Sequence, residues 1–200
     1  TSITSLVAPS ASQRFSPMHY KFSKLVRAAL VSIIAAAFAF WGSSSDIALL
    51  PVALYVLWFL SEWAVESPSP AEETIRDRGS RQAIVAVRDT SLMATAVYCW
   101  YLDITGNLYW AFGGSVLFLL GLAIRLKSIA TLGGNFSMSL TTKNAERWAL
   151  VTDGIYARIR HPGYVALYLI FLSWPLAARA WPVAIAVGVL AAIALWWRIT

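Results

Sequence analysis

The sequence predicts an all-α, polytopic integral membrane protein with five or six membrane helices, the last two of which form a C-terminal helical hairpin. Of its 200 residues, 58% are hydrophobic and only 13% are charged, a balance that soluble domains rarely show. Several apolar segments approach the length of about 20 residues that a helix needs to cross a bilayer. The ten Trp and eight Tyr residues suit membrane–water interfaces. The lipid bilayer is therefore the first expected partner.

The predicted helices correspond to six apolar segments near residues 25–41, 47–64, 83–102, 108–126, 163–178 and 181–197. A helix of about 18 residues rises about 27 Å, so these segments span a bilayer only narrowly. The last two are the shortest, and Pro175 and Pro182 bracket the turn expected between them. The polar stretch 1–20 is interpreted as a flexible tail, which leaves 21–200 as one membrane domain.

The distribution of basic residues predicts the orientation in the membrane. Lys and Arg precede the first segment and follow the second and the fourth, whereas the loops 42–46 and 103–107 contain none. Cytoplasmic loops carry the excess of Lys and Arg. The N-terminus and the long loop 127–162 are therefore predicted to be cytoplasmic, in what we expect to be a prokaryotic inner membrane. The same loops account for the net charge of +6, so no nucleic-acid partner is expected.

The third apolar segment follows a polar stretch, 67–80, that predicts a short cytosolic helix ended by Gly79. Arg88 and Asp89 then fall inside the apolar segment, where charges are costly. Adjacent residues do not face one another on a helix, so each should need another partner. The favoured interpretation starts this helix near Thr90 and leaves both charges at the interface. The alternative makes them a polar wall for the headgroup of a bound lipid.

Several common kinds of functional site are excluded by the residue types present. The chain contains neither a G-x-G-x-x-G sequence after a predicted strand nor a P-loop. Cys99 is the single cysteine, which rules out an internal disulfide and a Cys-based zinc cluster. The two histidines are His19 and His161, and His19 falls in the predicted tail. No metal ion is expected.

One polar stretch interrupts the apolar sequence, "LVTDGIYARIRHPGYVALYL" at 150–169. Because Pro162 disfavours helix at the residue before it and suits a first helical turn, His161 is predicted at a helix entrance near the cytosolic interface. Free N–H groups and the helix dipole make such an entrance attractive to an anion. Arg160 adds a positive charge, and the neighbouring tyrosines add hydroxyls and ring faces. The competing interpretation is anchoring at the headgroup level.

The sequence "LVTDGIYARIRHPGY" resembles the L-V-x-x-G-x-Y-x-x-x-R-H-P-x-Y motif of the isoprenylcysteine carboxyl methyltransferase family, integral membrane enzymes related to phospholipid N-methyltransferases. "RLKSIATLGGNFS" and "RDRGS" resemble other segments of that family. The resemblance implies S-adenosylmethionine (SAM) as the methyl donor, with Arg160 as an electrostatic partner at the reacting groups. The cofactor pocket that it implies is formed by Leu150, Val151, Gly154, Tyr156, His161, Pro162 and Tyr164.

The implied function is SAM-dependent methyl transfer to a lipophilic acceptor at the cytosolic membrane face, foremost the carboxylate of an isoprenylcysteine. A phospholipid amine or a small thiol is the alternative acceptor. An NADPH-dependent sterol-reductase-like protein is a further alternative, although that group usually has Asn-Pro where this chain has His161-Pro162. A membrane scaffold without catalysis is the last. Family members normally continue with a Glu-Glu pair and a closing helix, so a chain ending at Thr200 is expected to lack that lid. The oligomeric state is left open.

Overall fold

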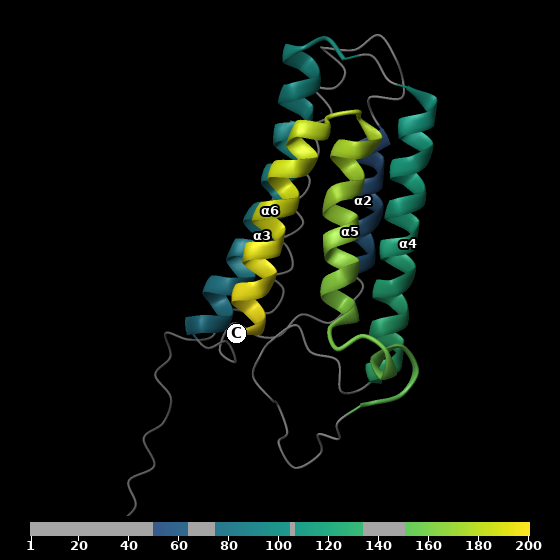
Figure 1. Ribbon diagram of the computed structural model, residues 1–200, viewed down its shortest axis with the longest axis vertical. Coiled ribbons are helices and arrows are strands. Elements are labelled where there is room, and N and C mark those ends of the chain that lie inside the picture. Colours follow the sequence, from purple (N-terminus) through teal and green to yellow (C-terminus); the bar gives the residue numbers. More distant parts are fainter. Residues whose placement is uncertain (1–49, 64–74, 105–106, 134–150) are drawn as a thin grey trace, which may run out of the picture.

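The computed structural model describes residues 50–63, 75–104, 107–133 and 151–200. In these ranges the chain is helical, with no strand, so the all-α prediction is confirmed for the described part (Figure 1). The first apolar segment and the predicted tail lie outside it. The elements are α2 (Leu50–Trp63), α3 (Ile75–Tyr101), α4 (Leu108–Leu132), the 3-10 helix η6 (Gly154–Ala157), α5 (Pro162–Ala177) and α6 (Trp181–Ile199).

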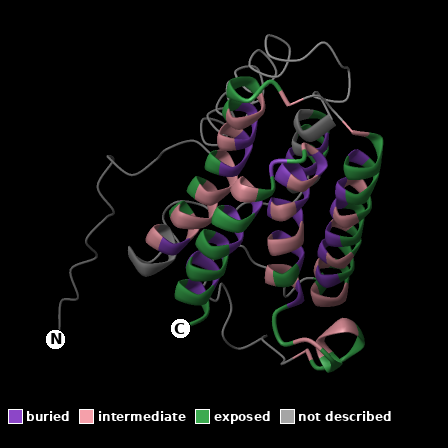
Figure 2. Ribbon diagram, turned by 45° about the horizontal axis from the view of Figure 1, so that its top comes forward, coloured by how far each residue is buried: buried purple, intermediate pink, exposed green. Residues whose placement is uncertain are grey.

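Two of the described helices, α4 and α6, are long and apolar enough to cross a membrane. Only 22% of the most apolar stretch of α4 and 39% of that of α6 is buried within the chain. Large apolar side chains, including Phe112, Leu119 and Ile193, are exposed on the outer faces of the bundle (Figure 2). Apolar surface of this extent calls for lipid or a partner. The number of spans and their orientation stay predictions.

Helix α3 begins earlier than predicted. It starts at Ile75 and runs through Gly79 without a break, so the prediction that Gly79 ends a short separate helix is wrong. A Cβ atom at Gly79 would lie 3.4 Å from Cη2 of Trp197. The glycine is therefore a close-packing residue, at which α6 approaches α3, rather than a helix stop signal.

The early start of α3 also corrects the interpretation of Arg88 and Asp89. Arg88 lies about 20 Å along the helix from Ile75, so the helix does not begin near Thr90. Arg88 Nε lies 2.6 Å from Asp89 Oδ1, and both side chains are largely buried. The long Arg88 side chain folds back to its neighbour, so the expectation that adjacent residues cannot pair is wrong here. Its guanidinium also lies 5.5 Å from the ring centre of Trp58.

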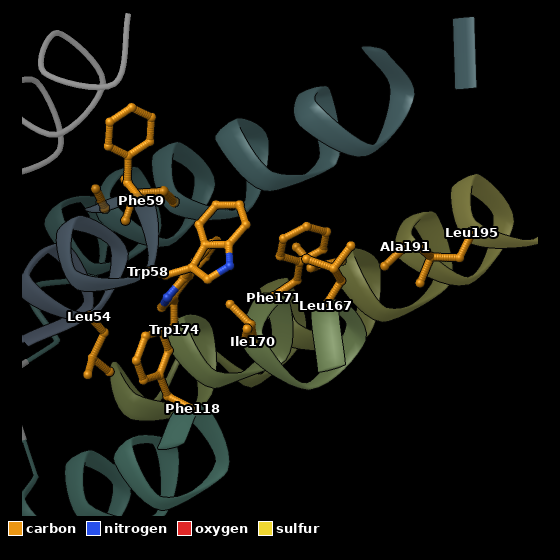
Figure 3. Close-up of a cluster of buried hydrophobic side chains, with 13 residues drawn as sticks. Leu54, Trp58, Phe59, Phe118, Leu167, Ile170, Phe171, Trp174, Ala191 and Leu195 are labelled. Atoms are coloured by element: carbon orange, nitrogen blue, oxygen red, sulfur yellow. The ribbon is translucent and has the colours of Figure 1, made fainter. Parts of the chain in front are cut away.

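The hydrophobic core lies where α5 meets α2, α3, α4 and α6. Trp58 meets Phe171 edge-on at 6.0 Å and Trp174 at 6.1 Å between ring centres. Figure 3 shows these rings gathered around α5 with Ile170 and Phe118 beside them. Because α5 lies at the centre of this cluster, its position and that of its first residues are fixed by packing.

Contact between α4 and α5 is closest at two glycines. A Cβ at Gly114 would lie 2.4 Å from the Cβ of Ala177, and one at Gly121 would lie 2.9 Å from Cγ1 of Ile170. The buried residues of α4 recur every three or four positions, as expected for one face of a helix. They are Ala111, Gly114, Phe118, Gly121, Arg125 and Ser128. The face that packs on α5 thus ends in two polar residues.

The prolines around the last turn have different roles. Pro182 lies in the first turn of α6, as predicted, but Pro175 lies inside α5, so it does not bracket the turn. Proline has no N–H, so Pro175 cannot donate to the carbonyl of Phe171 four residues earlier. Ser91 of α3 donates to that carbonyl through Oγ at 3.1 Å. A hydroxyl from another helix therefore replaces the bond that the proline removes.

Candidate functional site

Polar side chains from four helices and η6 gather at one end of the bundle, the lower end in Figure 1. Here α3 and α5 begin, α4 and α6 end, and η6 lies beside them. We call this group the polar end. Its members are Ser80, Arg125, Ser128, Tyr156, His161, Tyr164 and Arg198.

The entrance of α5 is built as the His161-Pro162 pair requires. Pro162 is the first helical residue and is buried, whereas His161 is exposed and caps the helix. The His161 carbonyl accepts hydrogen bonds from the backbone N–H groups of Tyr164 at 3.0 Å and Val165 at 3.2 Å. The His161 ring stacks on that of Tyr164, with centres 5.5 Å apart and planes 17° from parallel. The Tyr164 ring thus limits the orientation of the exposed His161 ring.

The 3-10 helix η6 is attached to the end of α4. The Tyr156 hydroxyl and the Ser128 hydroxyl are 2.6 Å apart. Gly154 has a φ of 59°, a left-handed conformation that favours glycine. A Cβ at Gly154 would lie 3.4 Å from Cγ2 of Thr131. The glycine therefore serves both the turn and the contact with α4.

The remaining predicted site residues take different places. Val151 is half-buried beside η6, and Leu150 lies outside the described residues. Arg160 is exposed, immediately before His161. No contact recorded within the described residues ties Arg160 to the polar end.

The structure adds residues that the sequence motif does not contain. Arg125 lies near the end of the predicted segment 108–126, but α4 continues to Leu132, and Arg125 is only 9% exposed on the buried face of that helix. A Cβ at Gly163 would lie 3.0 Å from Nη1 of Arg125 and 3.6 Å from Oγ of Ser128. Glycine at this position therefore lets the guanidinium lie against the first turn of α5.

Arg198, near the end of α6, is the second buried arginine of the polar end and is 8% exposed. Its Nε donates to the Tyr164 hydroxyl at 3.2 Å, and its Nη1 donates to Ser80 Oγ at 2.9 Å. It also lies in the last turn of α6, where the helix dipole favours a positive charge.

The charges at the polar end favour an anionic group. Two guanidinium groups lie close to the first turn of α5, at the end of the helix where the dipole carries partial positive charge. No group of three or more His, Cys, Asp or Glu side chains that could hold a metal occurs within the described ranges.

Comparison with known proteins points to the same region. Residues 114–200 match the isoprenylcysteine carboxyl methyltransferase (ICMT) family. A protein-S-isoprenylcysteine O-methyltransferase from Schizosaccharomyces pombe is 40% identical over 50 residues, which are 25% of this chain and 21% of that protein. No solved structure matches the chain. The resemblance of the polar stretch is confirmed: over residues 114–200, which carry every member of the polar end except Ser80, this chain is similar to the ICMT family.

Proposed function

We propose that this chain performs SAM-dependent methyl transfer to the carboxylate of an isoprenylcysteine-like lipid at the cytosolic face of a membrane. One observation carries the proposal: Tyr156, His161 and Tyr164 of the family-like motif gather with two buried arginines at one end of an otherwise apolar bundle. The similarity over residues 114–200 and the name of the fission-yeast relative support the isoprenylcysteine acceptor.

The residues of the polar end have the chemistry to hold SAM. Its carboxylate would lie at the start of α5, where the helix dipole favours an anion and the Arg125 guanidinium lies close by. The His161 ring, held against the Tyr164 ring, would donate a hydrogen bond to the charged methionyl part of the cofactor. Val151, Gly154 and the Leu150 position would complete the proposed pocket with Tyr156 and Pro162. When bound, SAM supplies a methyl group on a positively charged sulfur.

The reaction asks the chain for alignment rather than acid–base catalysis. A carboxylate is ionised at neutral pH and is already a nucleophile, so its attack needs no proton transfer. Holding the two reactants in line and excluding water can supply most of the rate. Arg160, exposed beside His161, is the residue we propose as an electrostatic partner for the acceptor carboxylate.

The apolar outer faces of α4 and α6 support a lipophilic acceptor. Exposed side chains such as Leu119 and Ile193 suit contact with acyl chains. The polar end adjoins the same helices. A prenylated molecule could therefore approach from the bilayer while the water-soluble cofactor arrives from the cytosol.

Acceptor assays with the protein in lipid nanodiscs test the proposal. Radiolabelled SAM would be supplied with a farnesylated cysteine analogue, with phosphatidylethanolamine or with a small thiol. We expect label only in the farnesylated analogue. Transfer to the amine or the thiol alone would replace the acceptor, and binding of NADPH in place of SAM would support the reductase alternative. If the protein binds neither SAM nor NADPH, the membrane scaffold without catalysis is the remaining alternative.

Replacing His161 by alanine tests the cofactor site directly. Loss of a hydrogen bond to a charged group costs about 1.5–3 kcal/mol, so the dissociation constant for SAM should rise about ten- to a hundredfold. Arg179→Gln changes an exposed residue in the turn before α6, at the other end of the bundle, and should leave SAM binding unchanged. Equal affinities of the two variants would make His161 an interfacial anchor.

A further inference from the structure

Arg198 is a buried charge whose position needs an explanation. It lies on the inner face of α6 in line with Ala191, Ala194 and Leu195, all of which are apolar. Removing a guanidinium from water is costly unless hydrogen bonds compensate for the loss. The hydrogen bonds that Arg198 makes therefore show what its burial achieves.

Those bonds join three helices. Arg198 belongs to α6, Ser80 to α3 and Tyr164 to α5, and Arg198 donates to both hydroxyls. Ser80 is fully buried, so this side of the guanidinium is anchored in the interior. The other side holds the phenol of Tyr164, whose position relative to α3 and α6 is thereby fixed.

The direction of these bonds determines what Tyr164 can offer a ligand. A guanidinium has only donors, so the Tyr164 oxygen must be the acceptor in this contact. The phenol hydrogen is then directed away from Arg198, and the hydroxyl presents itself as a donor. The Tyr164 ring also stacks on His161. Fixing the phenol therefore restricts the plane against which the His161 ring rests.

We propose that Arg198 is a positioning residue: it orients the Tyr164 hydroxyl as a hydrogen-bond donor, and through the stacked rings it orients His161, toward an anionic oxygen of the bound ligand. This inference rests on the proposed function, because the ligand is the cofactor or the acceptor of the methyl transfer. Arg198 itself need not touch that ligand.

A double-mutant cycle in the full chain tests the proposal. The variants are Arg198→Met, Tyr164→Phe and the two combined, with Arg179→Met as an exposed-arginine control at the other end of the bundle. We expect each single variant to raise the dissociation constant for SAM about tenfold, the effect of losing one charged hydrogen bond. The combined variant should bind no more weakly than either single variant. Multiplied losses would overturn the inference, because the residues would then act separately.

A spectroscopic measurement does not depend on SAM binding. With tyrosine labelled by ¹³C at Cζ, the NMR signal of Tyr164 is identified by its loss in Tyr164→Phe. We expect this signal to move in Arg198→Met and to stay in place in Arg179→Met. An unmoved signal would overturn the inference. If the wild-type protein binds no SAM, the proposed function fails, while this signal still decides whether Arg198 positions Tyr164.

Arg198→Lys guards against misfolding of the methionine variant. Lysine keeps the charge but lacks the planar fork that reaches two partners. It should preserve the fold and move the Tyr164 signal part of the way. Compared with Arg198→Met, the kcat of Arg198→Lys should return further toward the wild-type value than its KM for SAM does. This difference is expected if Arg198 acts by orienting groups in the bound state. A folded lysine variant with wild-type signal and wild-type kinetics would contradict the proposal.

Discussion

Replacing Gly114 by alanine tests the close contact of α4 with α5, which brings Arg125 to the start of α5. A Cβ at Gly114 would lie 2.4 Å from the Cβ of Ala177 and 2.6 Å from its backbone nitrogen. At Gly113, the residue immediately before Gly114, nothing lies within 4 Å of a Cβ placed in the same way. Carbon atoms rest about 3.5–4.0 Å apart, so the helices would have to separate by more than about 1 Å.

The expected magnitude follows from comparing the two neighbouring substitutions. Both should gain up to about 1 kcal/mol because alanine forms helix better than glycine. Only Gly114→Ala overpacks the interface, which typically costs about 1–3 kcal/mol. The upper end applies because the clash includes backbone atoms, which cannot rotate away. The free energy of unfolding of Gly114→Ala should therefore be about 3 kcal/mol lower than that of Gly113→Ala.

Unfolding of the detergent-solubilised variants by increasing fractions of sodium dodecyl sulfate measures this difference. The SAM affinity of Gly114→Ala should also fall, because displacement of α4 moves Arg125 away from Gly163. Adding Ala177→Gly should restore part of the stability by removing one of the clashing atoms. Equal stabilities of Gly113→Ala and Gly114→Ala would refute the reasoning, since they would show that the helices do not approach this closely.

Three further predictions use other contacts. Ser91→Ala should lower the free energy of unfolding by about 1–3 kcal/mol because the buried Phe171 carbonyl loses its donor. Adding Pro175→Ala should restore that stability by supplying a backbone N–H, and failure of this rescue would contradict the assigned bond. Tyr156→Phe should cost about 0.5–1.5 kcal/mol in stability and should weaken SAM binding, both read by calorimetry; an unchanged affinity would remove Tyr156 from the site. In a cysteine-free background, a thiol introduced at Lys127, near the end of α4, should react with an impermeant reagent added on the cytoplasmic side. A thiol at Tyr109, near the start of α4, should react from the opposite side, and the reverse pattern would invert the predicted topology.

The apolar segments predicted most of the described helices well. The segments 108–126, 163–178 and 181–197 correspond to α4, α5 and α6. Hydropathy locates such helices because each is apolar over most of its length, whether its side chains are mostly exposed, as in α4, or mostly buried, as in α5. It located the start of α3 and the end of α4 poorly, because both helices continue into polar sequence. Arg125 was consequently not recognised as a buried residue of α4.

Part of the polar end could have been found from the sequence. The motif contains His161 and Tyr164, and Pro162 between them marks the entrance of a helix. Arg125 and Ser128 continue the spacing of three or four residues set by Gly114 and Gly121 along the buried face of α4. Extending that periodicity beyond residue 126 would have placed Arg125 and Ser128 on the buried face of α4.

The partnership of Arg198 with Ser80 could not have been predicted in this way. The two residues are 118 positions apart, and no local pattern specifies which helices will be neighbours. Gly79 was the nearest available signal, because a glycine inside a helix often marks close packing. It was interpreted as a helix end. The contact with Trp197 shows that the same glycine marks the place where α6, and Arg198 with it, meets α3.

Burial of two arginines at the polar end fits the proposed ligand site. Apolar residues of similar size in place of a buried charged group are often neutral or stabilising, because they avoid the cost of desolvation. Arg125 and Arg198 nevertheless lie on the buried faces of α4 and α6, where their neighbours on the same faces are mostly small or apolar. Each reaches the first turn of α5, Arg125 at Gly163 and Arg198 through Tyr164. That turn is the positive end of the α5 dipole, where an anionic group is favoured. The apolar contacts along the bundle thus hold the polar end in place, and its two arginines serve the proposed site. Their desolvation costs some of the folding free energy.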